Sequence, residues 1–428
     1  MKYCLIENLN NDYSLPKNYT YVALTQEAIY YLDKRNVKYI TMEDFYSSGE
    51  IRGNTEKFLD DQLEWIAFFD KKIKEIYPDA KKLNMKLATI YFNWIKYMVD
   101  NIILTCKVIQ KFIDSTNPQK ILFINNNHGT DDLGHWEHIL HFQGVESTYS
   151  RITPLFCSKN NIEFDRIIIK IKKEKQNNFD LKLKLKSIFP LAITKYHNII
   201  KYGKILKFLL TQNGLNSKKT YNALFFSTQN FVKEFSKDLG HNSVKNYVFD
   251  NGNVYGYELP FIKKKSVKID SSYQLKKINE ENIFIDFNEI YRWINLKCNI
   301  DVSDVIKTRL DTFVYSICPN IIYLTKIFLD YYNKEKIDFI VTSHIFTLEE
   351  HAAIAAANLS KTTKSIYFHH GADAYEFNCR YFLLVKNFDY YFTTTFNEAK
   401  HEELIRNKYG FKLPIISSSN YFSNQYST

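Results

Sequence analysis

Residues 338–371 read DFIVTSHIFTLEEHAAIAAANLSKTTKSIYFHHG, and this segment determines the fold class that we predict for the chain. Residues 338–341 and 365–368 are short apolar runs of the kind that form buried strands. Between them, Thr347-x-x-Glu350 is a capping box that begins a helix, and the small residues 351–359 continue it. A strand, a helix and a second strand in this order predict two parallel, neighbouring strands of one sheet.

Polar residues follow both predicted strands. In an open parallel sheet, ligands bind beyond the carboxyl ends of the strands, so these residues are expected to meet at one edge. His369 and His370 are adjacent, so in an extended chain only one of them faces the crevice. We favour His370 because Gly371, with no side chain, lets a ligand approach the backbone there. The predicted catalytic residues are His370, Asp373 and Glu376, and the predicted substrate-binding residues here are His344, His369 and Gly371.

Two other polar residues of this segment are expected to be structural. Glu350 is interpreted as the reciprocal arm of the cap at Thr347, since the third helical residue of a capping box bonds back to the cap. His351 lies within the predicted helix, and we expect it on the protein surface.

The order of elements in the last part of the chain resembles a known family. The run SIYFHHGADAYE is followed by a strand, DYYFTTT, a helix, FNEAKHEELIRNKYG, and a last strand, PIISSS. This order is similar to the acceptor-side half of GT-B-type bacterial surface-polysaccharide enzymes. Those are capsule and lipopolysaccharide glycosyltransferases and related glycerophosphotransferases, in which a His-Gly pair after a strand lines the interdomain cleft. The resemblance covers residues 223–419, with a weaker echo at residues 21–46.

The resemblance implies two Rossmann-like domains with parallel sheets and a transfer reaction. The donor is a nucleotide sugar or a nucleotide-activated glycerophosphate, the acceptor is a glycan or lipid-linked glycan, and no further cofactor is needed for group transfer. The chain ends nine residues after Ser419, where the resembled enzymes begin a second Rossmann-like domain for the donor. We therefore expect a truncated enzyme, a chain that works with another chain, or an amino-terminal domain that has taken over part of the task.

The amino-terminal part of the chain also alternates strands and helices. Thr25 is expected to cap a helix that runs to Leu32. Residues 125–132, NNNHGTDD, form a polar loop of the kind that lines a crevice. The predicted strands are residues 3–6, 21–24, 39–41 and 120–124, and the predicted long helices are residues 54–76 and 83–115, the second with Ile90, Trp94, Met98, Ile102 and Ile103 on one face.

His135, His138 and His141 follow this loop and invite a metal interpretation. Residues at successive spacings of three drift around a helix, whereas helical metal pairs place ligands four apart. We therefore predict a polar helix face with Trp136 and Ile139 turned inward, and no metal site.

Residues 166–207 carry twelve Lys or Arg and two acidic residues, so their net charge equals the +10 of the whole chain. With its interspersed apolar residues, the stretch suits contact with an anionic membrane leaflet and equally suits a solvated linker helix. Its LKLKLK segment, residues 181–186, alternates like a surface strand. We exclude nucleic acid, because binding motifs are absent from the sequence and aromatic residues are not interleaved with the basic ones.

The carboxyl-terminal part begins with a strand at residues 223–226 that leads into Ser227 and Thr228. Two hydroxyls just before a helix can hold a phosphate or a sugar hydroxyl, although helix capping explains them equally well. Ser418, after the last strand, is a further candidate substrate-binding residue. Between these come a predicted strand at residues 283–287 and a long helix at residues 302–332.

Composition limits the class of protein. The 428 residues are 45% hydrophobic and 16% aromatic, which excludes a disordered chain. The six cysteines contain no CxxC pair, which indicates a reducing compartment. The amino terminus lacks an apolar core of signal-peptide length, and no run of about 18 uncharged apolar residues occurs. We expect a cytoplasmic protein, peripheral on the inner face of the membrane if the basic stretch binds lipid.

The predicted organisation is an α/β chain with an amino-terminal domain at residues 1–150, a basic amphipathic helical linker at residues 151–215, and a Rossmann-like, GT-B-like acceptor half at residues 216–428. The predicted function is transfer of a sugar or glycerophosphate from an activated nucleotide to a surface-polysaccharide acceptor. The alternative is a non-catalytic glycan-binding or accessory subunit of polysaccharide assembly.

Overall fold

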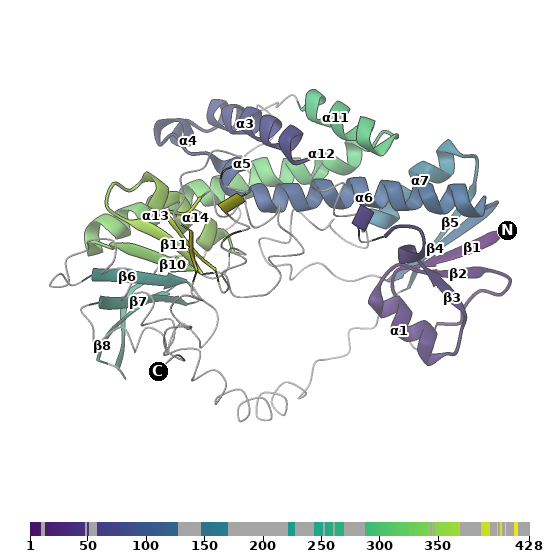
Figure 1. The fold of residues 1–428 in the computed structure, drawn as a ribbon, viewed down its shortest axis with the longest axis horizontal. Helices are drawn as coiled ribbons and strands as arrows, with labels where there is room; N and C mark the ends of the chain where they lie inside the picture. Colours follow the sequence, from purple (N-terminus) through teal and green to yellow (C-terminus); the bar gives the residue numbers. More distant parts are fainter. Residues whose placement is uncertain are drawn as a thin grey trace. The chain divides into compact units, whose positions relative to one another are not determined.

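The structure is a computed structural model of the whole chain (Figure 1). It describes residues 1–9, 13–47, 49–50, 58–126, 147–169, 221–226, 244–250, 253–259, 262–268, 287–342, 345, 347–368, 387–393, 400, 403–404, 407 and 415–417.

The chain forms two compact units, each built from three segments of sequence. The first comprises Met1–Lys72, Phe92–Glu174 and Ile278–Ile317, and the second comprises Ile73–Tyr91, Lys175–Lys277 and Cys318–Thr428. The boundary that we expected at residue 150 falls inside a helix, Thr148–Lys159, and the strand that follows it still belongs to the first sheet. A linker that begins at residue 151 is therefore not what the structure shows.

The first unit contains a five-stranded sheet in which every strand is parallel to its neighbours. The strand order is β3-β2-β1-β4-β5, so the direction of winding reverses between β1 and β4. Cys4, Leu5 and Ile6 of β1 are fully buried, as expected for a central parallel strand. The strands are β1 (Lys2–Ile6), β2 (Thr20–Ala23), β3 (Tyr39–Thr41), β4 (Lys120–Asn126) and β5 (Glu163–Ile169), and the first four confirm the sequence prediction.

Helices complete the first unit. Thr25 caps α1 (Gln26–Lys34) as predicted, because its hydroxyl accepts a 3.1 Å hydrogen bond from the Ala28 N–H. In α6, the predicted apolar stripe is buried, including Trp94, Met98 and Ile102. The other helices are the 3-10 turn η1 (Met42–Asp44), α3 (Leu59–Ile76), α6 (Phe92–Thr116), α7 (Thr148–Lys159), α11 (Asn288–Cys298), α12 (Ser303–Thr312) and the π-helical turn η5 (Phe313–Ile317).

Two sequence predictions about these helices need correction. The expected helix at residues 83–115 is divided into α5 (Leu87–Ile90) and α6, and a separate short helix, α4 (Pro78–Lys82), precedes them. Asn84 adopts a positive φ of 51°, a left-handed conformation that does not continue a right-handed helix. Phe287, expected in a strand, is instead the residue that precedes α11, and residues 283–286 lie outside the described part.

The second unit contains an eight-stranded sheet in the order β13-β12-β11-β10-β6-β7-β8-β9. The first six strands in this order are parallel, and β8 and β9 are added as antiparallel strands at one edge. As predicted, β10, β11 and β12 are parallel neighbours. The strands are β6 (Tyr221–Phe226), β7 (Val244–Asp250), β8 (Asn253–Leu259), β9 (Ile262–Lys268), β10 (Phe339–Thr342), β11 (Lys364–Phe368), β12 (Tyr390–Thr393) and β13 (Ile415–Ser417).

Two helices, α13 (Cys318–Glu335) and α14 (Leu348–Leu359), pack together in this unit (Figure 1). The buried face of α14 is mostly alanine, which allows close approach of the backbones. The Tyr332 hydroxyl of α13 donates a 3.1 Å hydrogen bond to the Ala353 carbonyl. The predicted capping box is confirmed. The Thr347 N–H donates to the Glu350 carboxylate at 3.0 Å, and the Glu350 N–H donates to the Thr347 hydroxyl at 3.2 Å.

One helical run is long and apolar enough to cross a membrane. It covers Ser303–Glu335, and 56% of its most apolar window is buried within the protein. The core helix of a soluble protein passes the same test, so this run by itself does not indicate a membrane span.

The five cysteines in the described part of the chain are buried free thiols. Burial raises the pKa of both Cys4 and Cys157 to about 12. These thiols therefore stay protonated in the folded protein at neutral pH, which makes them poor nucleophiles.

Candidate functional site

Each unit has one point at which the order of parallel strands reverses. In open α/β sheets, ligands bind beyond the carboxyl ends of the strands at such a point. In the first sheet it lies between β1 and β4, and in the second between β6 and β10. These two edges are the candidate sites, and we describe each within its own unit.

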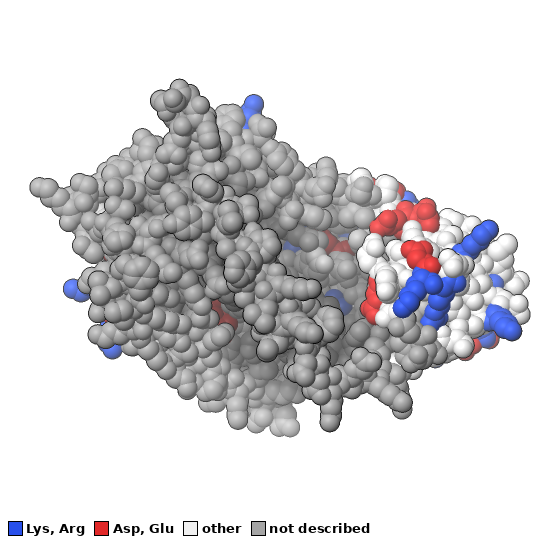
Figure 2. All heavy atoms as spheres, turned by 90° about the horizontal axis from the view of Figure 1, so that it is seen from below, with Lys and Arg blue, Asp and Glu red and all other residues white. Residues whose placement is uncertain are grey.

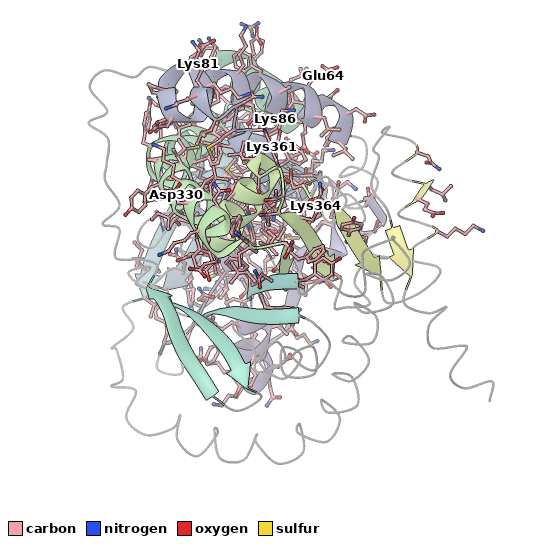
Figure 3. All side chains as sticks on the ribbon, turned by 90° about the vertical axis from the view of Figure 1, so that its left-hand side faces the viewer. Glu64, Lys81, Lys86, Asp330, Lys361 and Lys364 are labelled. Atoms are coloured by element: carbon pink, nitrogen blue, oxygen red, sulfur yellow. The ribbon has the colours of Figure 1, made fainter. Side chains whose placement is uncertain are left out.

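The carboxyl ends of β6, β10 and β11 lie at one edge of the second sheet. Thr342, the last residue of β10, is paired with Phe226 on one side and with Tyr367 on the other. Lys364, labelled in Figure 3, begins β11 at the opposite edge, where its ammonium group lies 3.0 Å from the Asp389 carboxylate. Strands β10 and β11, which precede the predicted histidines, are thus parallel neighbours as the sequence predicts, and β6 lies beside β10.

The predicted site residues themselves lie outside the described residues, so their mutual geometry stays a prediction. Ser227 and Thr228 follow β6 in the sequence, His344 follows β10, and the histidine pair follows β11. The residues concerned are His344, His369, His370, Gly371, Asp373, Glu376, Ser227, Thr228 and Ser418, and the same holds for His135, His138 and His141. Within the described residues, no group of three or more His, Cys, Asp or Glu could hold a metal ion.

The expectation that His351 lies on the surface was wrong, because its side chain is fully buried. Nδ1 lies 2.7 Å from the Thr347 carbonyl oxygen, which only accepts hydrogen bonds, so Nδ1 carries the proton. The imidazole packs on the ring of Tyr91, just after α5. Burial lowers the pKa of His351 to about 4, against a smaller raising effect of the Thr347 hydrogen bond. His351 is therefore a neutral residue of the core.

At the first sheet's reversal point, Glu7 follows β1 directly. Its N–H donates a 2.9 Å hydrogen bond to the Ile124 carbonyl of β4, and its own carbonyl accepts a hydrogen bond from the Thr25 hydroxyl. These two bonds fix its backbone at the carboxyl edge. Its side chain is buried, and only 8% of the residue's surface is exposed.

Burial raises the pKa of the Glu7 carboxyl above its ordinary value. A hydrogen bond from the Ser147 hydroxyl and the charge of Arg166 oppose this effect, in that order. The Glu7 carboxyl therefore keeps its proton to a higher pH than a solvent-exposed glutamate does. Such a group is suited to proton transfer or to hydrogen bonding with a ligand hydroxyl.

Other polar side chains surround Glu7 at this edge. Asn125, near the end of β4, is 1% exposed, and its Oδ1 accepts a 3.4 Å hydrogen bond from the Arg166 Nε of β5. The pKa of Tyr149 is raised to about 12 by burial, with a further contribution from the charge of Glu7. We call Glu7, Asn125, Ser147, Tyr149 and Arg166 the first-sheet polar cluster.

Sequence reasoning missed most of the first-sheet polar cluster. The loop that starts at Asn125 was expected to line a crevice, but no role was predicted for Glu7. The sequence did contain a signal for Glu7, because this polar residue comes directly after the apolar strand at residues 3–6. The polar segment that contains His344 follows residues 338–341 in the same way. Arg166 was counted in the basic stretch at residues 166–207, and the first four residues of that stretch, 166–169, belong to strand β5 rather than to a helix.

Charges on the described surface of the first unit are mixed in sign. Figure 2 shows Lys and Arg side chains beside Asp and Glu side chains at the right of the view, where Figure 1 places the first sheet. Lys120, for example, pairs with both Glu163 and Asp165, at 2.5 and 2.6 Å. Residues 170–207, which hold nearly all of the basic stretch, lie outside the described residues.

The fold and its two edges define the class as an α/β protein with two parallel-stranded sheets, compatible with Rossmann-like domains. Comparisons of the chain with family models, with curated proteins and with solved structures found no match.

Proposed function

We propose that the chain transfers a sugar or a glycerophosphate from a nucleotide-activated donor to a surface-polysaccharide acceptor, in the manner of GT-B-type transferases. One observation carries this proposal. All of the predicted residues except Ser418, which follows β13, come after three strands, β6, β10 and β11, which are neighbouring and parallel and which end at the reversal point of the second sheet. This is the edge at which α/β proteins bind substrates.

The first sheet gives the proposal further support. A GT-B-type enzyme needs two Rossmann-like domains, one for the donor and one for the acceptor. The first unit has a parallel sheet with its own reversal point and the first-sheet polar cluster beside it. We propose that the first unit binds one of the two substrates at its own reversal point.

The proposed chemistry uses His370 as the general base. His370 takes the proton of the acceptor hydroxyl while the acceptor oxygen forms a bond to the donor sugar or glycerophosphate. The bond from the transferred group to the donor's remaining phosphate breaks, and the nucleotide leaves with that electron pair. Asp373 and Glu376 bind acceptor hydroxyls or assist the base. Ser227, Thr228 and Ser418 bind donor or acceptor oxygens, with His344, His369 and Gly371 lining the same edge.

This function places the protein in the cytoplasm, where nucleotide-activated donors are made, and at the inner face of the membrane, where lipid-linked glycans are extended. The basic stretch at residues 166–207 is proposed to contact anionic lipid there. Capsule or lipopolysaccharide biosynthesis is the proposed setting.

The second candidate is a non-catalytic glycan-binding subunit. It is favoured by the sequence, which contains neither GxGxxG nor a Walker-type loop for a nucleotide. In that case acceptor recognition at the second sheet persists while the chain has no turnover of its own.

A turnover assay with a binding assay separates the two functions. The whole chain is incubated with a panel of nucleotide sugars, with nucleotide-activated glycerophosphate and with fragments of the host's surface polysaccharide, and nucleotide release is measured. Turnover that His370→Ala abolishes and His401→Ala, outside the predicted site, preserves would support the transferase. Glycan binding without turnover would support the subunit, and neither activity would refute both.

A further inference from the structure

Two of the buried cysteines, Cys106 and Cys298, lie together in the core of the first unit. Cys106 belongs to α6 and Cys298 is the last residue of α11, and these two helices pack against each other. Cys298 continues the buried stripe that Ile290 and Ile294 form along α11, because residues four apart lie on one face of a helix. Both cysteines are free thiols.

Neighbouring side chains show independently that α6 and α11 are close at these two positions. Lys107 and Lys297, which adjoin the two cysteines in the sequence, both lie over the ring of Phe58. Each ammonium nitrogen is 4.9 Å from the centroid of that ring. The end of α11 is also held by α3, because the Trp293 indole donates a 2.9 Å hydrogen bond to the Asp61 carboxylate. The positions of the two cysteines are therefore fixed by contacts that do not involve their sulfur atoms.

The thiol groups of Cys106 and Cys298 form a hydrogen bond with each other. This hydrogen bond and, after it, burial raise the pKa of Cys106. Because a protonated thiol is a poor nucleophile, the pair is stable in its reduced form and reacts slowly. The same hydrogen bond places the two sulfur atoms near each other, and a disulfide requires two such cysteines on adjacent stretches of backbone.

We propose that Cys106 and Cys298 are an oxidative modification site, at which a peroxide converts the two thiols into one intramolecular disulfide. In the first step one sulfur attacks a peroxide oxygen, the O–O bond breaks, and hydrogen peroxide leaves a sulfenic acid and one water. In the second step the other sulfur attacks the sulfenic sulfur. The S–S bond forms, the S–O bond breaks, and the oxygen leaves with the thiol proton as a second water. Both thiols are oxidised and the peroxide is reduced.

The disulfide would join two segments of the first unit that are far apart in the sequence. Cys106 lies in the segment Phe92–Glu174 and Cys298 in the segment Ile278–Ile317, and residues 175–277 between these segments belong to the second unit. The covalent loop therefore includes strands β6 to β9. Closing such a long loop restricts the unfolded chain, so the oxidised protein should resist unfolding. Disulfides in a reducing compartment are usually transient, which suits a response to an oxidant.

Peptide mapping of the whole chain tests the site. The reduced protein is exposed to hydrogen peroxide in native buffer, the remaining thiols are blocked with N-ethylmaleimide, and the digest is analysed without reductant. We expect a linked pair of peptides that contain Cys106 and Cys298, and dithiothreitol should separate them. Protein oxidised in concentrated urea is the control, because an unfolded chain should pair its cysteines less selectively.

Two variants complete the test. Cys298→Ala should abolish the linked peptides, whereas Cys157→Ala, which removes another buried cysteine of the same unit, should preserve them. Peroxide should raise the Tm of the unmodified chain and of Cys157→Ala, and should leave the Tm of Cys298→Ala unchanged. The mapping of the unmodified chain decides the question even where a variant fails to fold.

The outcomes do not depend on the proposed function, because the reaction requires no transferase activity. Recovery of Cys106 and Cys298 from native buffer as unlinked thiols, as sulfinic acids, or linked to other cysteines would overturn the site. The same mixture of pairings in native buffer and in urea would also overturn it. Formation of the linked peptides without a rise in Tm would retain the modification site and refute its stabilising effect.

Discussion

The imidazole ring of His351 lies against the ring of Tyr91, with 4.7 Å between the two ring centroids. Both residues are fully buried, and the contact joins α14 to the end of α5 within the second unit. A charged imidazole would be poorly solvated there. The protonation state of the His351 imidazole therefore makes the stability of the second unit depend on pH.

We expect acid to destabilise the second unit through His351. The folded pKa is about 4, below the ordinary 6.5, so the unfolded chain binds a proton first as the pH falls. The stabilising effect is complete above pH 6.5 and is lost progressively down to pH 4, by about 3 kcal/mol in total. Urea unfolding at several pH values measures this loss. His351→Phe keeps an aromatic ring without titrating, and an unchanged pH dependence in that variant would contradict the prediction.

Glu7 should have the opposite dependence on pH. Its folded pKa is raised, so its contribution to stability is present below the unfolded pKa and is lost as the pH rises through the folded value. Glu7→Gln keeps the size and hydrogen-bonding capacity of the neutral acid. We therefore expect a higher Tm for Glu7→Gln than for the unmodified chain at pH 7, and a much smaller difference at pH 4. Glu43→Gln, at an exposed position of the first unit, is the control.

The capping box of α14 should contribute measurably to the second unit. Thr347→Ala removes the hydroxyl that accepts the Glu350 N–H, and we expect a loss of about 1 kcal/mol in the free energy of unfolding. Thr362→Ala, at an exposed position after the helix, should have little effect. Chemical denaturation of the three proteins gives the comparison, and equal stabilities would show that the cap contributes nothing.

The two interpretations of the basic stretch differ in a sedimentation experiment. If residues 166–207 bind anionic lipid, the chain should sediment with phosphatidylglycerol vesicles at low salt and less so as salt rises, because salt screens the attraction. Replacement of Lys182, Lys184 and Lys186 by serine should reduce the sedimented fraction. Equal sedimentation with neutral vesicles, or none at low salt, would leave the linker as the remaining interpretation.

Local sequence patterns predicted the elements well where burial and propensity act together. The strand predicted at residues 338–341 is Phe339–Thr342, and the Thr347 cap was visible because its chemistry needs residues only three apart. The side-by-side placement of β10 and β11 also followed from the sequence, since a short helical crossover leaves few alternatives.

Local sequence patterns could not predict contacts between distant parts of the chain. Arg309 donates to Thr148 across 161 residues of sequence, and no local pattern indicates that pairing. The burial of His351 depends on α5 and the Tyr91 ring that follows it. The sequence predicted one continuous helix at residues 83–115 and therefore did not predict α5 as a separate helix. No local pattern indicates that β6 lies next to β10. Only the strand order shows that Ser227 and His344 follow neighbouring strands.

The buried thiols provide a probe of local opening in each unit. Cys4 and Cys157 belong to the first unit and Cys318 to the second, and all three are shielded from solvent. A thiol reagent in excess can modify them only when the surrounding core opens, so the labelling rate at each cysteine reports local opening. Peptide mapping after timed exposure would then show whether the two units open together or separately, without any engineered probe.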